Sequence, residues 1–460
     1  MKVKTLFFLL TLILVSSGSG FSQDTLRIGF PEFLAIALEN SGQMKVVGTN
    51  IELAENQTQM AKDQRFLPSL SLRSEHAIVP SVDSPGDYAD DQIYLDPDAT
   101  NDWSKVGLYT RVRLQGVQPV FTWGAINKAI NAAKIAARAT EEEYNATQAE
   151  IELILYDLYY SYVFALEIER LLTDAEDKIE QIERALEKQR EENPEEADDT
   201  DEYKFRIFKA QFDIQREEVA QSLHYVKETW NYALRNALGI IYEPQVRFLD
   251  PVQLKMEHLG FYQKSAKDNR PELLALELGK EALTEYIESL KSQNLPGLYL
   301  GFTTTFASTP IRPRQPNPFI STPENTFNTA IGFTIRQNLN FFQAKTSFER
   351  SKLEVSRLNY LKDSQQDLII LEVNDAYRKA ALAEVKVEKT GEALQVAKEW
   401  LRMEQLDYDF GFGDSKDLVD AVRQELELRL SEMEGIFELN STVAKLNKSA
   451  GIPLTATRNN

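Results

Sequence analysis

The chain runs through one order of segments twice. A helical stretch ends at Leu67-Pro68 and is followed by an alternating strand, a polar loop, a second alternating strand and a very long helical tract. The same order starts again at Leu295-Pro296. Self-similarity on this scale constrains the architecture before any single residue does. For 460 residues we therefore predict two copies of one unit folded together, not two or three unrelated domains.

The N-terminus has the parts of a secretory signal peptide over residues 1–22. Lys2 and Lys4 precede an apolar run from Leu6 to Val15, and small residues follow. The apolar run is about half of the ~20 residues that a spanning helix needs, and no later segment reaches that length without charge. We expect cleavage after Ser22 and no transmembrane helix in the mature chain.

Composition excludes several classes of protein. Cysteine is absent, which excludes disulfides, thiolate metal sites and a lipidated N-terminal cysteine. The formal net charge is -20, and the expected leader carries only the two lysines, so the mature chain would carry -22. Such a surface repels nucleic acid and anionic lipid and attracts cations or basic partners.

Four segments alternate apolar and polar residues with the period of a strand that has one apolar and one wet face. Each matches the ~9 to 11 residues of a tilted membrane strand. The first is interrupted by Ser74 and His76 on its apolar side. In the second, Arg111 and Arg113 lie opposite the aliphatic residues, so that side must face water, as lumen-facing residues or simply as solvated ones. The predicted strands cover about 68–79, 105–119, 297–307 and 327–339.

Long helical tracts follow each pair of strands. Their apolar spacing and lack of proline predict a helix over 124–192, which would be roughly 100 Å long at 1.5 Å per residue. A second long helix is predicted over 342–409, and shorter helices return over about 201–241 and 415–450. The expected units are a first repeat over 23–242, a linker over 243–262 and a second repeat over 263–460, and each repeat begins with a helix.

Four strands cannot close a membrane barrel, which needs at least ~8 to leave no unpaired edge in lipid. The chain must therefore oligomerise. Two copies would close an eight-stranded barrel whose lumen is filled by side chains, whereas three would leave an open pore. We predict a mixed fold: a membrane β-barrel continued by a long α-helical barrel, closed as a homotrimer.

The junctions Leu67-Pro68, Leu295-Pro296 and Gln118 to Gly124, in this order, resemble those of the TolC family of outer-membrane efflux proteins. The most specific stretch, Phe410 to Ala421, resembles the periplasmic tip turn of that family. The resemblance implies a trimer with a twelve-stranded barrel in the outer membrane and a helical barrel across the periplasm. It also implies docking onto a periplasmic adaptor protein and an inner-membrane pump of the RND or ABC type.

The resemblance also implies roles for tip residues. Asp417 and Asp420 match the family's tip aspartates, and three copies of each would ring the periplasmic aperture and bind cations. Their plain alternative is helix stabilisation, because acidic residues in a first turn favour the helix dipole. Gly411, Gly413 and Ser415 belong to the turn that docks the adaptor, and Tyr408 matches a latch-region tyrosine. Gly413 stands where the best-known member of the family has an arginine that helps to latch the tip shut, and the tip of the first repeat, 191–203, lacks the glycine turn.

Nothing in the sequence indicates catalysis. No nucleophile, base and orienting acid occur in a recognisable pattern, and His76, His224 and His258 have no ligand spacing. We expect no enzyme activity and no cofactor or metal. The first hypothesis is a passive exit duct of an efflux or type I secretion system; the second is a periplasmic coiled-coil scaffold whose alternating segments form ordinary sheet. The cargo and the identity of the pump do not follow from the sequence.

Overall fold

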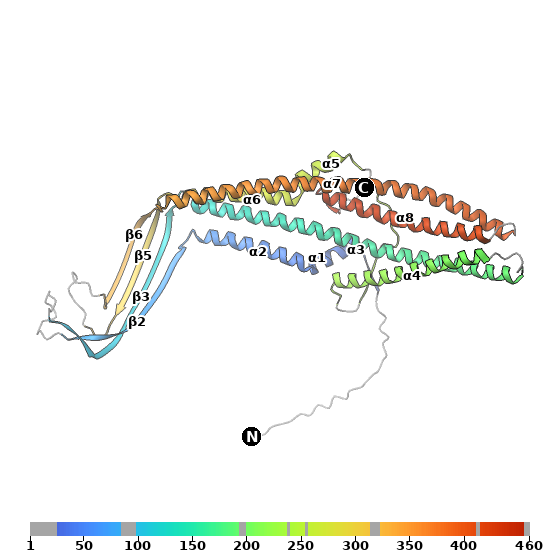
Figure 1. Cartoon of the computed structure of the whole chain (residues 1–460). Helices are drawn as coiled ribbons and strands as arrows, with labels where there is room; N and C mark the ends of the chain where they lie inside the picture. The colour runs from blue at the N-terminus through green and yellow to red at the C-terminus, as the bar shows by residue number, and fades with distance from the viewer. Residues whose placement is uncertain are drawn as a thin grey trace, which may run out of the picture.

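A computed structural model of the protein describes residues 25–83, 98–192, 199–236, 240–253, 256–312, 323–410 and 415–454. Four strands lie at one end of an elongated body, and helices run from their base to the opposite end (Figure 1). The signal peptide expected over residues 1–22 lies outside the described residues. Among the described residues no helix is both long and apolar enough to cross a membrane.

The first helical segment is divided into two helices, where the sequence suggested a single one, and a short strand precedes them. Strand β1 (Thr25–Ile28) precedes helix α1 (Phe30–Asn40) and helix α2 (Gly42–Asp63). Ser41 separates the two helices, because its backbone is extended and its hydroxyl accepts a hydrogen bond from the Met44 amide at 3.3 Å. A serine in this position satisfies one of the free amides of the first turn and so starts a new helix.

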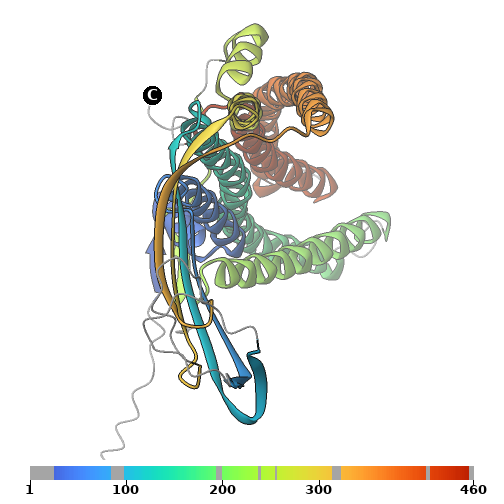
Figure 2. The same ribbon diagram turned by 90° about the vertical axis from the view of Figure 1, so that its left-hand side faces the viewer.

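The four alternating segments form one antiparallel sheet with the strand order β2-β3-β5-β6. The elements are β2 (Ser69–Asp83), β3 (Thr100–Phe121), β5 (Gly297–Ser308) and β6 (Thr326–Arg336). Strands β2 and β3 are longer than the predicted 68–79 and 105–119, because their pairing resumes after a bulge between Pro80 and Ser81. Strand β6 ends before the predicted position 339. Figure 2 shows the sheet curving along its length.

Two very long helices leave the sheet, each followed by a shorter helix that returns from the far end. Helix α3 (Ala125–Glu192) has 68 residues and α7 (Phe341–Asp409) has 69, so each is about 100 Å long. The returning helices are α4 (Asp199–Ala233) and α8 (Ser415–Ser449). The prediction that α4 extends to 241 is wrong, since Arg235 has a left-handed backbone with φ 47° and the chain then forms β4 (Ile241–Pro244).

The segment between the two halves has regular structure of its own. Strand β4 pairs in parallel with β1, which ties the middle of the chain to its N-terminus. Helix α5 (Leu259–Asn269) begins inside the expected linker 243–262, and α6 (Pro271–Gln293) leads into β5. Pro271 suits the first turn of α6, where its missing amide hydrogen leaves no bond unmade.

The helices below the sheet follow the order of the strands. Helix α2 packs on α3, α3 on α6, and α6 on α7, so the helix order α2-α3-α6-α7 repeats the strand order β2-β3-β5-β6. Farther from the sheet α3 packs on both α4 and α8, and α8 on α7. This half therefore has the order α4-α3-α8-α7. Helix α7 lies at one edge of the layer in both halves.

The buried core lies among the helices and not on the sheet. One cluster is aromatic: Phe33 stacks on Trp230 with ring centroids 4.4 Å apart, and Tyr159 packs beside both. A second cluster lines α3, α4 and α8 toward the far tip. The third uses small residues of α7, including Ala376 and Ala380, which allow close packing.

Candidate functional site: the strand sheet and the helical tip

The strand register brings the apolar residues of all four strands to one face of the sheet. Leu72 on β2 pairs with Leu114 on β3, and Leu114 pairs with Thr304 on β5. On the same face, Val112 on β3 pairs with Phe306 on β5, which pairs with Phe327 on β6. Most of these apolar side chains are exposed in the single chain; Leu72, Ile331 and Ile335, for example, are at least 70% exposed. A continuous exposed apolar face of this size marks an interaction surface.

The polar residues that interrupt this face have hydrogen-bond partners within the sheet. Ser74 Oγ and His76 Nε2 lie 2.9 Å apart, and His76 Nδ1 lies 3.1 Å from Thr110 Oγ1 on the neighbouring strand. His76 thus bridges the two hydroxyls, which lowers the cost of keeping these polar groups on an apolar face. The interruption at Ser74 and His76 therefore does not break β2.

The opposite face carries the charged residues. Arg113 lies opposite Arg73 on β2 and Thr305 on β5. Arg111 forms an ion pair with Glu75 at 3.7 Å, and Glu75 also binds Arg73 at 2.8 Å. Arg111 and Arg113 thus lie on the charged face, as their parity predicted, but Glu75 partly neutralises Arg111. This partner could have been found from the sequence by testing which residue of β2 pairs with position 111.

Both edges of the sheet are free in the described chain. Strand β2 pairs only with β3, and β6 pairs only with β5. Unpaired strand edges are templates for pairing with another chain. Because all four strands alternate in direction, β6 of one copy would be antiparallel to β2 of the next.

At the end of the sheet away from the helices, Arg312 holds the hairpins together. Its Nε donates to the Pro80 carbonyl at 2.9 Å, and one Nη donates to Asn101 Oδ1 at 3.2 Å. The other Nη forms an ion pair with Glu324 at 3.2 Å. The segment after β5 is therefore fixed to the ends of β2 and β3 by one side chain.

At the opposite end of the sheet, side chains fasten the strands to the helices. Gln118 of β3 accepts a hydrogen bond from the Leu67 amide at 2.8 Å and donates to the Arg65 carbonyl at 2.7 Å. Trp123 donates from its indole nitrogen to the Pro296 carbonyl at 2.9 Å. Leu67 and Trp123 have positive φ angles, which such contacts help to hold.

The helical tip contains the predicted aperture residues. Asp417 is exposed in the first turn of α8, and Asp420 is partly buried and forms an ion pair with Arg423 at 3.1 Å. Tyr408, near the end of α7, packs against the apolar tip cluster, and burial raises the pKa of its hydroxyl, with a smaller contribution from Asp409. Ser415 begins α8, while Gly411 and Gly413 lie outside the described residues.

Arg423 was missed by the sequence reasoning, although its position three residues after Asp420 was the available signal. Residues at this spacing lie side by side on a helix. The pair partly neutralises Asp420, so Asp417 is the less compensated of the two carboxylates.

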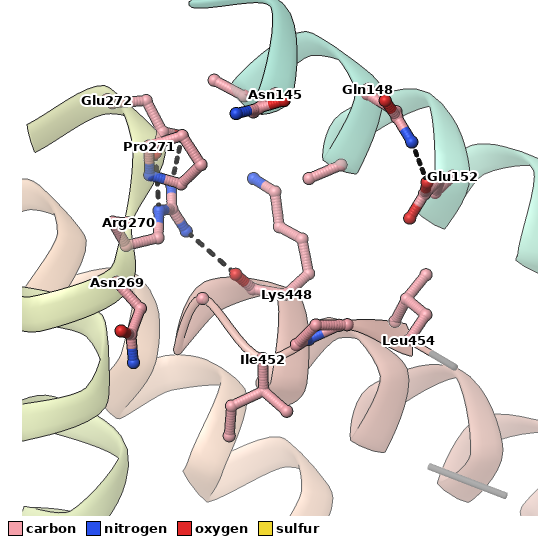
Figure 3. A pocket seen from close by; sticks show the side chains of 14 residues that line it. Asn145, Gln148, Glu152, Asn269, Arg270, Pro271, Glu272, Lys448, Ile452 and Leu454 are labelled. Carbon is pink, nitrogen blue, oxygen red and sulfur yellow. Dashed lines mark hydrogen bonds and ion pairs between the residues drawn. The ribbon is translucent and has the colours of Figure 1, made fainter. Parts of the chain in front are cut away.

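A cavity of about 260 Å³ lies midway along the body, between α3, the start of α6 and the end of α8. Figure 3 shows Lys448 pointing into it, with Arg270 at its wall. The Arg270 guanidinium binds both carboxylate oxygens of Glu272 at 2.8 and 2.9 Å and Glu372 at 3.2 Å. It also donates to the carbonyls of Lys448 and Ser449 at the end of α8.

The charged groups around this cavity bind one another. Lys448 lies 3.5 Å from Glu372 and 3.9 Å from Glu150, and Gln148 donates to Glu152 at 2.6 Å. Arg270 is only 4% exposed. The site is therefore a junction that fixes α6, α7 and α8 to one another.

Other buried polar groups serve the same packing. Glu167 accepts a hydrogen bond from the Leu249 amide at 3.0 Å, and burial raises the pKa of its carboxyl above the ordinary value. Tyr159 donates to the Ile28 carbonyl at 3.0 Å, whereas the hydroxyl of the buried Tyr162 has no hydrogen-bond partner among the residues that the structure describes. Within the described ranges no group of three or more His, Asp or Glu side chains is placed to hold a metal ion.

No protein-family model and no curated protein matches the sequence. Solved structures do match the fold. The open-state MtrE outer membrane channel of Neisseria gonorrhoeae has a TM-score of 0.67 at 15% identity, covering 94% of this chain and 93% of that one. The outer membrane protein VceC of Vibrio cholerae has a TM-score of 0.66 at 16% identity, covering 92% and 96%.

A third match is the CmeC outer membrane channel of Campylobacter jejuni, with a TM-score of 0.67 at 14% identity over 92% of this chain and 85% of that one. These structures are outer-membrane channels of the TolC type. The chain therefore has the fold of TolC-family outer-membrane efflux channels, and the resemblance of the sequence to that family is confirmed at the level of the fold.

Proposed function

We propose that the protein is a passive outer-membrane channel, the exit duct of a trans-envelope efflux or type I secretion system. The observation that carries this proposal is the open four-stranded sheet. It has one apolar face, one charged face and two free edges, and it stands on helices arranged in the same order. A sheet of this kind is completed by closing into a barrel with lipid outside and water inside.

The duct is proposed to be a homotrimer built from two structural repeats per chain. Three copies supply twelve strands, an even number that closes without a parallel contact because each copy begins and ends with strands of opposite direction. Twelve strands leave an open lumen, whereas eight would be filled by side chains. The long helices then continue the barrel as a tube through the periplasm.

The proposed partners are a periplasmic adaptor protein and an inner-membrane pump that supplies the energy. The helical body itself contains no recognisable nucleotide-binding loop. The tip between α7 and α8, including Gly411, Gly413 and Ser415, is the proposed docking surface, and Tyr408 beside it the proposed latch. Support comes from the fold shared with outer-membrane efflux channels.

Asp417 and Asp420 are the proposed periplasmic aperture. In a trimer each would occur three times around the axis, and rings of carboxylates favour cations. Because Arg423 compensates Asp420, we expect Asp417 to contribute more to cation binding. Arg111 and Arg113 are the proposed lumen-facing charges of the barrel.

Planar-bilayer conductance of the purified protein tests the channel. We expect discrete conductance steps that divalent cations block from the periplasmic side, with the block weakened more by Asp417→Asn than by Asp420→Asn. Fractionation is the accompanying measurement: a channel stays with outer membranes, whereas a periplasmic scaffold is released by osmotic shock. Release as a soluble protein without conductance would favour the scaffold and reject the channel.

A further inference from the structure

The charged face of the strand sheet carries more cations than anions. From Ser69 to Pro80 of β2, and along the segments of β3, β5 and β6 that continue this ladder, the ionised residues are four arginines and one glutamate. The register places all of them on the charged face: Arg73, Arg111, Arg113, Arg336 and Glu75. Four positive charges against one negative charge give this face a net charge of +3, in a chain whose formal net charge is -20.

Three of the arginines form a compact cluster. Arg73 and Arg113 are direct cross-strand partners, and Glu75 and Arg111 are the next pair on the same face. Directly opposite residues have Cβ atoms about 5 Å apart, and two residues along a strand cover about 7 Å. Three guanidinium groups and a single carboxylate therefore share a patch that is two strands wide and about 7 Å high.

The single carboxylate does not neutralise this cluster. One oxygen of Glu75 lies 2.8 Å from Arg73, and the other lies 3.7 Å from Arg111. Among the residues that the structure describes, Arg113 has no carboxylate at ion-pair distance, and the buried Nε of Arg111 has no hydrogen-bond acceptor. The guanidinium of Arg111 lies over the ring of Tyr109, 5.4 Å from its centroid, which helps to hold it in place.

The chemistry of this cluster is that of an oxyanion site. Like charges directly opposite each other destabilise a sheet, as Arg73 and Arg113 do here. An anion between them removes this repulsion and supplies acceptors to donors that lack them. Guanidinium groups are suited to carboxylate and phosphate groups, because their planar fork of N–H donors matches two oxygens at once.

We propose that Arg73, Arg111 and Arg113 form an oxyanion-binding site on the inner wall of the barrel, for solutes that carry carboxylate, phosphate or sulfate groups. The proposal rests on the proposed function, because only a closed barrel turns this face toward a lumen, and it adds the chemical class of the solute. Three copies bring nine of these arginines and three glutamates to one level of the lumen. The duct then has arginines in its barrel and aspartates at its helical tip.

The test is block of the bilayer current by citrate or pyrophosphate, added on the side of the sheet away from the helices, in potassium chloride without divalent cations. We expect both probes to block the unchanged protein, and the stronger of the two shows whether carboxylate or phosphate is preferred. The triple variant Arg73→Gln, Arg111→Gln and Arg113→Gln should need a probe concentration higher by roughly tenfold or more for half block, because it lacks the charged donors.

Arg336→Gln is the matched control for Arg113→Gln, because both remove one charge from the same face. Arg336 pairs with Gly297, eight residues along β5 from Thr305, the partner of Arg113, so the two arginines lie about 27 Å apart along the strands. This separation exceeds the Debye length of about 10 Å at ~0.1 M salt, and we expect Arg336→Gln to change the half-block concentration by less than about twofold.

Two further variants separate a site from a diffuse charge. Glu75→Gln removes the only carboxylate of the cluster and should lower the half-block concentration by roughly threefold, which keeps the test decisive if the triple variant fails to assemble. Arg113→Lys keeps the charge without the fork, so it should weaken block while leaving the reversal potential in a salt gradient unchanged.

The outcomes distinguish the site from the channel. A conducting channel that neither probe blocks, or that both probes block equally in the unchanged protein and the triple variant, would overturn the site and leave the channel intact. Equal effects of Arg113→Gln and Arg336→Gln would overturn a discrete site. A protein without conductance would overturn the proposed function, and the site with it.

Discussion

Replacing Arg270 with alanine tests whether the junction around the mid-body cavity holds the helices together. The guanidinium binds Glu272, Glu372 and two carbonyls at the end of α8, and it is only 4% exposed. Its removal leaves Glu272 without this cation, leaves Glu372 with Lys448 as its ion-pair partner, and takes a donor from two carbonyls. Removing one partner of a buried pair costs about 3 to 5 kcal/mol.

We expect a loss in the free energy of unfolding of about 3 kcal/mol, at the lower end of that range. The reason is that Glu272 and Glu372 remain 23% and 32% exposed, so water replaces part of what they lose. Arg270→Lys keeps the charge but cannot bind the same set of acceptors in the fixed fork of a guanidinium, and we expect an intermediate loss.

The measurement is urea unfolding of the purified protein followed by the circular dichroism of its helices. Arg357→Ala is the matched control, because Arg357 is 67% exposed and forms one ion pair with Glu354 on the surface of α7. Exposed pairs contribute roughly 0 to 1 kcal/mol. If Arg270→Ala and Arg357→Ala lower the unfolding free energy equally, the interpretation of this junction as a structural lock is wrong.

Three further predictions concern other parts of the helical body. Tyr159→Phe removes a buried hydrogen bond and should lower the unfolding free energy by about 1 kcal/mol. Tyr162→Phe removes a buried hydroxyl that has no partner in the described part of the chain, so the unfolding free energy should stay unchanged or rise. Equal losses in urea titration would contradict this contrast. Gly451→Ala should lower the free energy of unfolding by about 1 to 2 kcal/mol, because Gly451 has φ 69° and lies beside neighbouring backbone. Gly391→Ala within α7 should raise it by roughly 0.5 to 1 kcal/mol. Thermal unfolding of the two variants compares them. The raised pKa of Glu167 means that the folded state binds a proton at this carboxyl more tightly than the unfolded chain does. Protonated Glu167 therefore stabilises the fold fully below pH 4.5, and this stabilisation is lost as the pH rises through the folded pKa. Glu167→Gln should remove that part of the pH dependence of the unfolding free energy, and identical pH profiles of the two proteins would refute the assignment.

The secondary structure was largely accessible from the sequence because its periods are long and clear. The tracts that became α3 and α7 lack proline and repeat apolar residues over many turns, so their ends agree with the structure within one residue. The apolar parity of the strands also predicted which residues share a face. The division at Ser41 and the end of α4 at Ala233 were not predicted, because a single capping hydroxyl and a left-handed Arg235 decide them.

The side-chain partners required three dimensions. Glu75 and Arg111 are adjacent only through the register of β2 and β3, and Arg270 reaches the end of α8 from 178 residues away in the chain. Asp417 and Asp420 could be proposed from the resemblance to a family, but the sequence reasoning did not weigh the compensation of Asp420 by Arg423. Their role at an aperture stays a prediction until conductance is measured.

The fastenings between sheet and helices have a mechanical consequence. Gln118 hydrogen-bonds the backbone at Arg65 and Leu67, both within the turn from α2 to β2, and Trp123 joins the residues just before α3 to those just before β5. These hydrogen bonds restrict the rotation of the helices about their axes relative to the base of the strands. A torque applied to the long helices at their distal end would therefore be transmitted to the strands. Removing these hydrogen bonds, for example with Gln118→Ala, would uncouple helix rotation from the strands.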